Sequence, residues 1–322
     1  MKGILEILAG GGYVSGEKIS HELGISRAAV WKRIEQLREE GWRIESGGKR
    51  GYRLLADDSV NPVFWQEQLT TRELGRGENC YQPTLESTNT TLKQMAVHGA
   101  PNGSLCVCDC QTGGKGRLGR SWVVPSGQGL LLSVLLRPHM LPRHAPLITL
   151  AAAIAMTRAV QETTSLDVRI KWPNDLVCKG KKICGILLEI SADPDQIEYV
   201  VVGTGLNVRR NSYPPELADK AGALEEFAAP PLRRDVLTHY LRALEDTIDL
   251  LEKDGFAGIQ AEYRRYSCTL GSAVRVIGTD SEFTGVAEEL DETGALLVRM
   301  EDGTLRRVLS GDVSVRGLMG YV

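Results

Sequence analysis

Hydrophobic residues recur every three or four positions in two short runs near the amino terminus, with a glycine between the runs. The recurring positions are Ile19 and Leu23 in the first run and Val30, Ile34 and Leu37 in the second. This spacing places the apolar side chains of each run on one face, so it predicts two helices joined by a tight turn. Gly24 can adopt the positive φ that such a turn often needs, and Ser26 suits the N-cap of the second helix.

The pattern then changes to strand-like alternation in residues 41–46 and 50–54, on either side of the turn Gly47-Gly48-Lys49. Two helices followed by a hairpin with a basic tip predict a winged helix that binds DNA. The candidate DNA-binding residues are Ser26, Arg27, Lys32, Arg33, Lys49 and Arg50. A helical protein-interaction module of the same shape is the alternative, and only DNA binding predicts an affinity that falls with salt.

The net charge of −3 is unevenly distributed along the chain. Residues 1–54 contain ten Lys or Arg against seven Asp or Glu, whereas the rest of the chain contains 28 against 34. The basic excess favours the amino-terminal end as the nucleic-acid-binding end, although a solvated charged face would produce the same excess. Residues 56–62 are polar and end in proline, which predicts a linker to a second domain.

Apolar strands with glycine-rich or polar ends follow in the middle of the chain. They are predicted at residues 168–170, 182–189 and 199–207. The first strand ends at Lys171, where the sequence Trp-Pro-Asn-Asp interrupts it, and strand ends are favoured positions for binding groups. Gly185, Gly203 and Gly205 lack side chains and would let backbone approach a ligand.

A loop at residues 113–120 carries Lys115, Arg117 and Arg120 among four glycines. It follows a predicted strand at 104–110 and has the spacing G-x-G-x-x-G, but residues 120–125 cannot sustain the helix that a dinucleotide-binding motif must open. The Walker spacing fails as well. Cations and backbone N–H groups together suit a polyphosphate or a charge that develops during nucleotidyl chemistry, and a solvated basic turn is the alternative.

The carboxy-terminal third changes from helical to strand-like spacing. The helical positions are Leu237, Leu241, Leu244, Ile248 and Leu251, which predict a packing helix. Short strands separated by turns predict a small antiparallel barrel, with strands at residues 274–276, 283–287, 295–300 and 305–309.

Composition narrows the class of protein. A chain of 322 residues with 42% hydrophobic and 25% charged residues is expected to form two or three globular domains. No apolar run reaches the roughly 18 residues of a membrane span, so we expect a soluble protein without a signal peptide. Seven cysteines without paired spacing favour reduced thiols in a cytoplasm. Cys106, Cys108 and Cys110 share one strand face and could bind a metal, but small core residues are the preferred interpretation.

Taken in order, these motifs resemble those of the biotin protein ligases. The matching segments are ESTN at 86–89, GKGRLGRSW at 114–122, KWPND at 171–175, GILLE at 185–189 and GTGLN at 203–207. Gln111 stands where the family has its ureido-binding glutamine. With a winged helix in front, nearly the whole chain resembles the bifunctional class that joins a biotin ligase to a biotin operon repressor.

The resemblance implies an α+β multidomain protein. Its expected parts are a winged helix-turn-helix domain at 1–60, an α/β catalytic domain with a mixed sheet at 61–268, and an SH3-like β-barrel at 269–322. Biotin and ATP, accompanied by Mg2+, would form biotinyl-5'-AMP with release of pyrophosphate, and biotin would pass to a lysine of a biotin carboxyl carrier protein. Biotinyl-5'-AMP would also act as corepressor by promoting a homodimer on operator DNA.

The same resemblance implies roles for individual residues. Lys171, Arg117 and Arg120 are the expected catalytic residues, with Lys171 at the biotin carboxylate and the α-phosphate. The expected biotin site consists of Ser87, Thr88, Asn89, Gln111, Gly114, Lys115, Arg117, Lys171, Gly185, Leu187 and Gly205, with Leu206 nearby. The expected nucleotide site consists of Arg117, Arg120, Trp122, Asn174 and Asn207. Trp122 would cover adenine or belong to the core, and no protein ligand is assigned to Mg2+, for which Asn174 and Asp175 are only candidates.

Two positions depart from the family's loop. Lys115 replaces an arginine, which keeps the charge but loses the planar fork of donors, and Leu118 replaces a residue that is basic in some members. Two other functions stay open: a transcription factor that only senses biotin or its adenylate, and a lipoate or octanoate ligase of related fold. The presence of Lys171, Arg117 and Arg120 argues against a transcription factor that has lost catalysis. The ureido-facing residues Ser87, Thr88 and Gln111 distinguish a biotin ligase from a lipoate or octanoate ligase.

Overall fold

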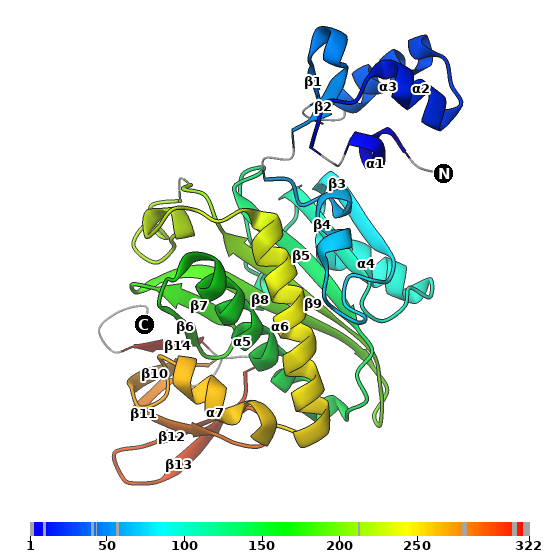
Figure 1. Ribbon diagram of the computed structural model, residues 1–322. Coiled ribbons are helices and arrows are strands. Elements are labelled where there is room, and N and C mark those ends of the chain that lie inside the picture. Colours follow the sequence, from blue (N-terminus) through cyan, green and yellow to red (C-terminus); the bar gives the residue numbers. More distant parts are fainter. Residues whose placement is uncertain are drawn as a thin grey trace.

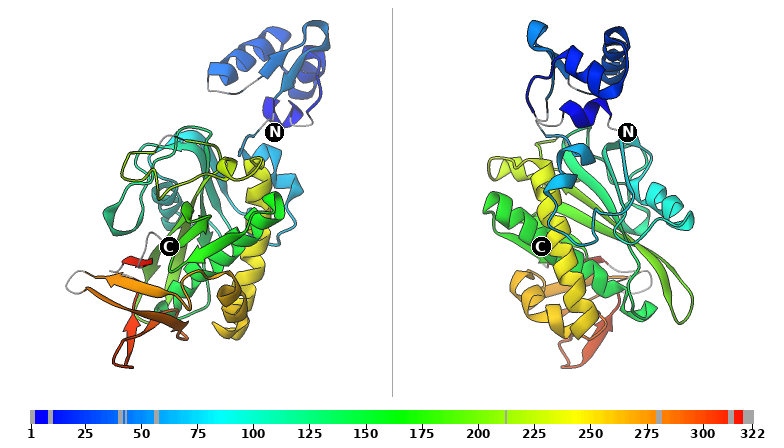
Figure 2. Two further views of the ribbon diagram at one scale, coloured as in Figure 1. Left: turned by 90° about the vertical axis from the view of Figure 1, so that its left-hand side faces the viewer. Right: turned by 45° about the vertical axis from the view of Figure 1, so that its right-hand side comes forward.

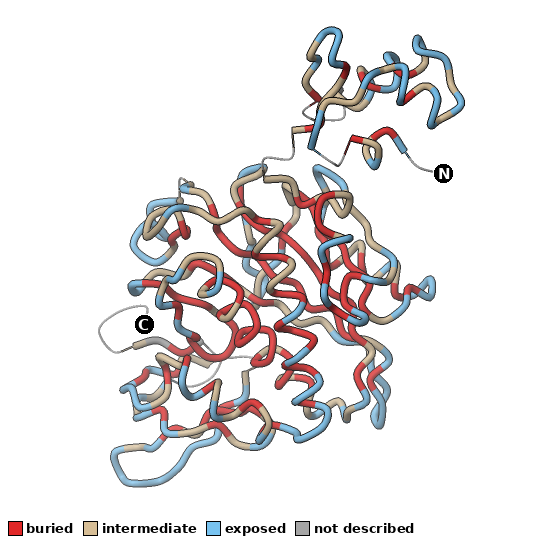
Figure 3. The backbone as a smooth tube through the Cα atoms, viewed as in Figure 1, coloured by how far each residue is buried: buried red, intermediate tan, exposed pale blue. Residues whose placement is uncertain are grey.

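A computed structural model describes residues 3–8, 11–39, 42, 44–55, 58–211, 213–278, 282–310 and 314–317. A small helical module lies at one end, a large sheet with its helices fills the middle, and a second sheet lies at the other end (Figures 1 and 2). Buried residues concentrate in the central sheet and the helices that cover it (Figure 3). Among the described helices, none is long and apolar enough to span a bilayer.

The amino-terminal module contains α1 (Ile4–Leu8), α2 (Gly16–Leu23), α3 (Arg27–Glu39), β1 (Ile44–Ser46) and β2 (Tyr52–Leu54). The predicted turn is present, because Gly24 follows α2 with φ 63° and Ser26 Oγ accepts a hydrogen bond from the Ala29 N–H at 3.2 Å. The predicted hairpin is also present, but Arg50 lies in its 3-10 tip rather than in a strand. Residues 41 and 43 of the predicted first strand lie outside the described residues.

The central sheet has seven strands in the order β3-β4-β5-β9-β8-β7-β6. These are β3 (Asn79–Leu85), β4 (Leu105–Gln111), β5 (Gly129–Leu136), β6 (Val168–Lys171), β7 (Asp175–Cys178), β8 (Lys181–Ala192) and β9 (Ile197–Asn207). Strands β3 and β4 are parallel, and every other neighbouring pair is antiparallel. The prediction of a mixed sheet is therefore confirmed.

Alternation along the strands divides their side chains between two faces of this sheet. The helices are α4 (Thr88–Val97), α5 (Pro146–Thr164), α6 (Arg233–Asp254) and α7 (Ala257–Tyr266). Val134 and Val202 belong to the large core that includes α5 and α6, whereas Leu135 and Val201 pack with Leu92 of α4. Helix α4 thus covers the opposite face from α5 and α6. The predicted packing helix is α6, whose repeating leucines are buried.

The carboxy-terminal module is an antiparallel sheet in the order β13-β12-β11-β10-β14. Its strands are β10 (Ala273–Ile277), β11 (Glu282–Leu290), β12 (Leu296–Arg299), β13 (Leu305–Val308) and β14 (Ser314–Gly317). The structure differs from the predicted barrel. Strands β13 and β14 are the two edges of the sheet, and the described residues show no pairing that closes it. Strand β14 was not predicted. One side of the sheet approaches the central domain, where Trp172 Nε1 donates to the Gly294 carbonyl at 3.1 Å.

The predicted linker is attached to the central domain instead of lying free. Asp58 accepts hydrogen bonds from the backbone N–H of Arg233 at 2.5 Å and from its guanidinium at 3.2 Å. The same guanidinium, only 4% exposed, also donates to Asp109 Oδ1 at 2.8 Å, and Asp109 accepts from the Tyr81 hydroxyl at 2.6 Å. Because Arg233 begins α6 and Asp109 lies in β4, this network ties the linker to two elements of the central domain.

Glu245 of α6 holds the chain segment that precedes β3. Its carboxylate accepts the backbone N–H groups of Arg72, Glu73 and Leu74 at 2.7 to 3.0 Å. Burial alone would raise the pKa of Glu245 and is the largest single effect. The hydrogen bonds together outweigh burial, so the pKa lies below its ordinary value of 4.5.

We expect Glu245→Gln to lower the free energy of unfolding by about 1–3 kcal/mol at pH 7, because three backbone donors lose their charged acceptor. A carboxylate with a depressed pKa stabilises the folded state above pH 4.5, and this contribution is lost as the pH falls through the pKa in the folded state. Denaturant unfolding at pH 7 and pH 3.5 measures the loss of unfolding free energy in the variant and its dependence on pH. The exposed Asp246→Asn is the control, and a deficit for Glu245→Gln that is equally large at pH 3.5 would contradict the assignment.

Candidate active site

The candidate site lies on the sheet face that α4 covers. Side chains alternate along β8 and β9, so Gly185, Leu187 and Glu189 share this face with Gly203 and Gly205. Ile186 and Leu206 point to the other face and are buried in the core of α5 and α6. Leu206 was expected near the biotin tail together with Gly185, Leu187 and Gly205, and the structure places it on the opposite face of the sheet from these three residues.

The residues expected to bind the ureido ring lie together in one cluster, which is buried except for the half-buried Gln111. Gln111 Oε1 accepts from the Thr88 N–H at 2.8 Å and lies 3.1 Å from the Thr88 hydroxyl. Ser133 Oγ lies 2.8 Å from Thr88 Oγ1 and 2.6 Å from Asn89 Oδ1. Ser87 caps α4 and is also buried. The structure thus brings together the predicted residues Ser87, Thr88, Asn89 and Gln111.

Three members of this cluster were not predicted, namely Ser133, Glu189 and Lys93. Ser133 is the single polar residue in the apolar run of β5, and that interruption was the available signal. Glu189 accepts hydrogen bonds from Asn89 Nδ2 and Lys93 Nζ, both at 2.8 Å. Burial favours the neutral carboxyl, but hydrogen bonds from Lys93 and Asn89 and the charges of Lys93 and Lys115 outweigh it. The pKa of Glu189 is therefore lowered, and the carboxylate is ionised at neutral pH.

The indole of Trp122 covers the glycines of the site. A Cβ atom on Gly205 would lie 2.4 Å from Trp122 Nε1, and one on Gly185 would lie 3.1 Å from the indole ring. A Cβ on Gly203 would lie 2.1 Å from Asn89 Oδ1. The open backbone expected at these glycines is thus filled by protein side chains. Trp122 is not a fully buried core residue, because it is partly exposed. Its indole nevertheless packs on the sheet at Gly185 and Gly205.

The glycine-rich loop is a compact turn. Gly116 N–H donates to the Arg120 carbonyl at 2.7 Å, and Trp122 N–H donates to the Gly114 carbonyl at 2.9 Å. Leu118 has φ 56°, a left-handed conformation that is uncommon for a branched side chain, and it is 51% exposed. Lys115 and Arg120 are exposed as well. The loop therefore presents two of its cations to solvent beside the site.

Arg117 joins the loop to both neighbouring parts of the protein. Its guanidinium donates to Asn174 Oδ1 at 2.8 Å and to the carbonyl of Ser310 in the carboxy-terminal module. Asn174 Nδ2 in turn donates to the Ile186 carbonyl at 2.9 Å. The side chain of Asn174 is thus engaged at both ends, and its role here is to connect the loop to β8.

Lys171 ends β6 and is only 6% exposed. In the register of β6 and β7, Lys171 lies opposite Asp175. The Asp175 carboxylate lies 2.5 Å from Lys182 Nζ. Burial raises the pKa of the neighbouring Cys268 thiol to about 11, and the positive charge of Lys171 partly opposes that shift. A buried lysine is therefore held at the strand end that the sequence singled out.

Asn207 is also committed within the protein. It is 4% exposed, and its Nδ2 donates to the Gly222 carbonyl at 3.0 Å. The donor expected to face adenine is thus used to hold the segment that follows β9. Of the predicted nucleotide residues, Arg117, Arg120 and Trp122 have exposed surface, whereas Asn174 and Asn207 are buried.

The three cysteines of β4 do not form a shared polar site. Cys106 and Cys108 are fully buried, and burial raises the pKa of Cys108 to about 12. The described residues contain no group of three His, Cys, Asp or Glu side chains placed to hold a metal ion. Cys106 and Cys108 are core residues, as expected for all three, whereas Cys110 is partly exposed.

The candidate DNA-binding residues are distributed over α3 and the wing. Arg27 and Lys32 are exposed on α3, with the 58% exposed Trp31 beside them. Lys49 and Arg50 are exposed at the tip of the hairpin, where the Arg50 guanidinium lies 4.1 Å from the centre of the Tyr13 ring. The sequence did not lead us to expect Trp31 on this surface.

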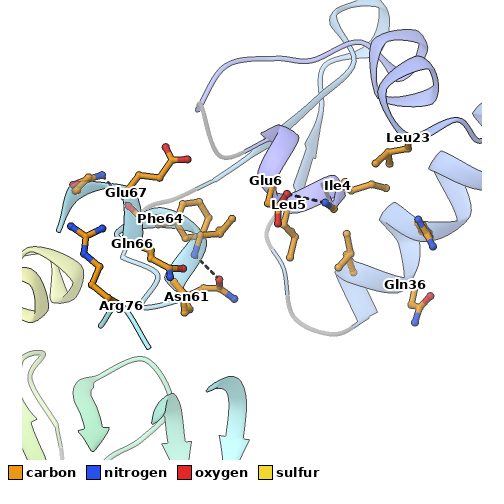
Figure 4. Close-up of a pocket in the computed structure, with 16 residues that line it drawn as sticks. Ile4, Leu5, Glu6, Leu23, Gln36, Asn61, Phe64, Gln66, Glu67 and Arg76 are labelled. Atoms are coloured by element: carbon orange, nitrogen blue, oxygen red, sulfur yellow. Dashed lines mark hydrogen bonds between the residues drawn. The ribbon is translucent and has the colours of Figure 1, made fainter. Parts of the chain in front are cut away.

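Arg33 lies on a different flank of α3. It lines a cleft of about 1270 Å³ together with Gln36 and Leu37, opposite the 3-10 turns Pro62–Phe64 and Gln66–Gln68 (Figure 4). The cleft separates the amino-terminal module from the central domain and contains none of the predicted active-site residues. Among the predicted DNA-binding residues of α3, Arg33 lines this cleft, whereas Arg27 and Lys32 do not.

Comparisons with known proteins match all three parts of the chain. A family described as "Biotin/lipoate A/B protein ligase family" matches residues 81–207, an HTH domain family matches 2–53, and a biotin protein ligase carboxy-terminal domain family matches 269–316. The chain is 35% identical to the bifunctional ligase/repressor BirA of Bacillus subtilis over 98% of both chains. It is 29% identical to BirA of Escherichia coli over 97% of this chain and 96% of that protein.

A solved structure supports the same relationship. The biotin protein ligase from Aquifex aeolicus in complex with biotin and ATP is 28% identical, with a TM-score of 0.66 over 74% of this chain and 99% of that one. Sequence identity extends from the helix-turn-helix through the carboxy-terminal module in the bacterial relatives. The chain belongs to the family of bifunctional biotin protein ligases that are also DNA-binding repressors.

Proposed function

We propose that this chain forms biotinyl-5'-AMP from biotin and ATP and passes biotin to a lysine of a biotin carboxyl carrier protein. The buried cluster around Thr88 and Gln111 carries this proposal. A ureido ring is neutral and needs matched donors and acceptors once it is buried. The cluster supplies hydroxyl, amide and backbone groups at less than 5% exposure for Ser87, Thr88 and Asn89, which suits biotin and not the apolar chain of octanoate.

The mechanism needs charge stabilisation rather than a protein nucleophile. The biotin carboxylate attacks the α-phosphate of ATP, the bond from that phosphate to the β-phosphate breaks, and pyrophosphate leaves. Lys171 offsets the repulsion between the two anions and stabilises the transition state, because a buried ammonium is less screened than one in water. Arg117 and Arg120 hold the phosphates, and the carrier lysine then displaces AMP from the acyl group.

Mg2+ would accompany ATP, and we assign it no protein ligand. Asn174 Oδ1 accepts a hydrogen bond from Arg117, and Asp175 is paired with Lys182, so the two candidate ligands are engaged within the protein. Divalent magnesium keeps several waters and is commonly bound through the nucleotide phosphates. No step above depends on a protein ligand to this ion.

The amino-terminal module binds operator DNA in this proposal, with biotinyl-5'-AMP as corepressor. Adenylate binding would order the loop of residues 113–120 and favour a homodimer, which would place two winged helices on a palindromic site. The exposed cations of α3 and the wing support the DNA contact. We place the protein in the cytoplasm, since all seven cysteines are unpaired.

We also propose domain boundaries at 1–60, 61–268 and 269–322, with an SH3-like barrel as the last domain. The separate amino-terminal core supports the first boundary, although Phe64 packs in that core while Val60 packs in the central one. The open sheet of β10 to β14 supplies the strands that a barrel would use.

ATP–pyrophosphate exchange tests the ligase proposal without a known carrier. Purified protein with Mg2+ and ATP receives biotin, lipoate, octanoate or no acid. We expect exchange with biotin only. Exchange with lipoate or octanoate instead would identify a different acyl ligase, and binding of biotin without any exchange would identify a regulator that only senses it.

A further inference from the structure

Lys182 lies beside Trp122 and Gly185 but belongs to none of the groups of residues assigned above. Its Nζ lies 2.5 Å from Asp175 Oδ1, with the Lys182 and Asp175 side chains 25% and 16% exposed. The same ammonium lies 5.3 Å from the ring centre of Trp122. The ion pair is therefore partly shielded from water and is in contact distance of an aromatic face.

The strand register explains how Lys182 reaches both partners. Asp175 of β7 lies opposite Gly185 of β8, and Gly185 lies opposite Gly205 of β9. A Cβ atom on Gly185 would lie 3.1 Å from Lys182 Nζ and 3.1 Å from the Trp122 ring. The missing side chain at Gly185 thus makes room for the ammonium and the indole to meet over the strand.

The backbone of Lys182 is tied to the segment that holds Asn207. Its N–H donates to the Lys220 carbonyl at 2.7 Å, and its carbonyl accepts from the Gly222 N–H at 2.9 Å. The Gly222 carbonyl accepts the Asn207 amide at 3.0 Å. Lys182 is therefore linked, through side chain and backbone, to both residues that were expected at adenine.

We propose that Lys182 is a positioning residue for the nucleotide: fixed by Asp175, its ammonium holds the Trp122 indole in the orientation in which the exposed part of the ring receives adenine. This inference rests on the proposed function, because it needs Trp122 to contact ATP. A cation against an aromatic face restrains the ring, and the carboxylate restrains the cation. Removal of the cation should weaken ATP binding and leave the ureido cluster unchanged.

The test compares Lys182→Met and Lys182→Arg in ATP–pyrophosphate exchange with biotin. We expect Lys182→Met to raise the KM for ATP roughly tenfold, with the KM for biotin changed less than about twofold, because only the nucleotide side loses a contact. Lys182→Arg keeps the charge and should recover most of the loss. Lys181→Met is the matched control, since Lys181 is the adjacent residue and pairs with Glu226 at 3.1 Å, away from Trp122.

Equal rises in both KM values, or the same change in Lys181→Met, would overturn the proposal. Near-UV circular dichroism gives a second readout without substrates, with the Trp122 signal defined as wild type minus Trp122→Phe. Lys182→Met should abolish most of that signal, and an unchanged signal would also overturn the proposal. A wild-type protein without biotin-dependent exchange contradicts the proposed function alone, and the dichroism then decides on Lys182 by itself.

Discussion

Lys171→Met is expected to lower the rate of biotin-dependent ATP–pyrophosphate exchange by roughly 10²- to 10³-fold, the range seen when one preorganised electrostatic group is removed from a reaction centre. Lys171 is 6% exposed, so water cannot replace its charge without a rearrangement of the strand end. Methionine has a similar length and no charge, and therefore tests the charge rather than the packing. The biotin-dependent exchange rate at saturating substrates is the measurement.

Two controls separate catalysis from folding. Lys253→Met removes an equivalent charge from the exposed end of α6 and should exchange like wild type. Thermal unfolding of Lys171→Met should stay close to wild type. The variant should still bind biotin through the ureido cluster, which does not include Lys171, but more weakly, because the biotin carboxylate loses its cation. Normal exchange in Lys171→Met would remove the central catalytic assignment even if the family membership stands.

Simultaneous replacement of Arg27 and Lys32 by alanine is expected to weaken binding to operator DNA about 10²-fold or more, because each lost base or phosphate contact costs about 1–3 kcal/mol. Both side chains are exposed on α3 and available to a DNA groove. The probe is a palindromic duplex that the wild-type protein selects from a random library in the presence of biotin and ATP. Fluorescence anisotropy over a series of salt concentrations gives the affinity and the salt slope, which should become shallower.

Arg33→Ala is the matched control, because Arg33 has the same charge and helix but lines the cleft beside the linker. We expect a smaller loss for Arg33→Ala than for either single alanine variant at 27 or 32. Omission of biotin and ATP should weaken wild-type binding to the selected duplex. An affinity that is independent of both substrates would refute the corepressor part of the proposal and leave the ligase part intact.

Sequence periodicity was sufficient wherever the structure depends on neighbours along the chain. The repeat ending at Leu23, the turn at Gly24 and the cap at Ser26 are contacts within a few residues, and each was predicted at its place. Strands β8 and β9 were predicted for the same reason, since apolar runs bounded by polar residues mark buried strands. The barrel was predicted from spacing alone, and spacing cannot say whether the edges β13 and β14 pair.

The candidate site divides in the same way. The motifs alone were sufficient to predict Gln111, Thr88 and Lys171 as site residues, because residue type and order are properties of the sequence. Ser133 and Lys182 belong to the site only because β5 and β8 lie beside β9 in one register. A shift of one residue in that register would move each side chain to the other face. In the observed register Leu206 faces the core of α5 and α6, whereas its neighbour Gly205 faces Trp122.

The amino-acid sequence by itself determined the winged helix, the strands with their glycines and the family of the protein. Only the tertiary structure decided that Trp122 lies over Gly185 and Gly205, and that Asp58 is held by Arg233, 175 residues away. Contacts of this kind depend on strand order, register and the packing of distant segments. These follow from the burial of the whole chain at once, and no local pattern of polar and apolar residues encodes them.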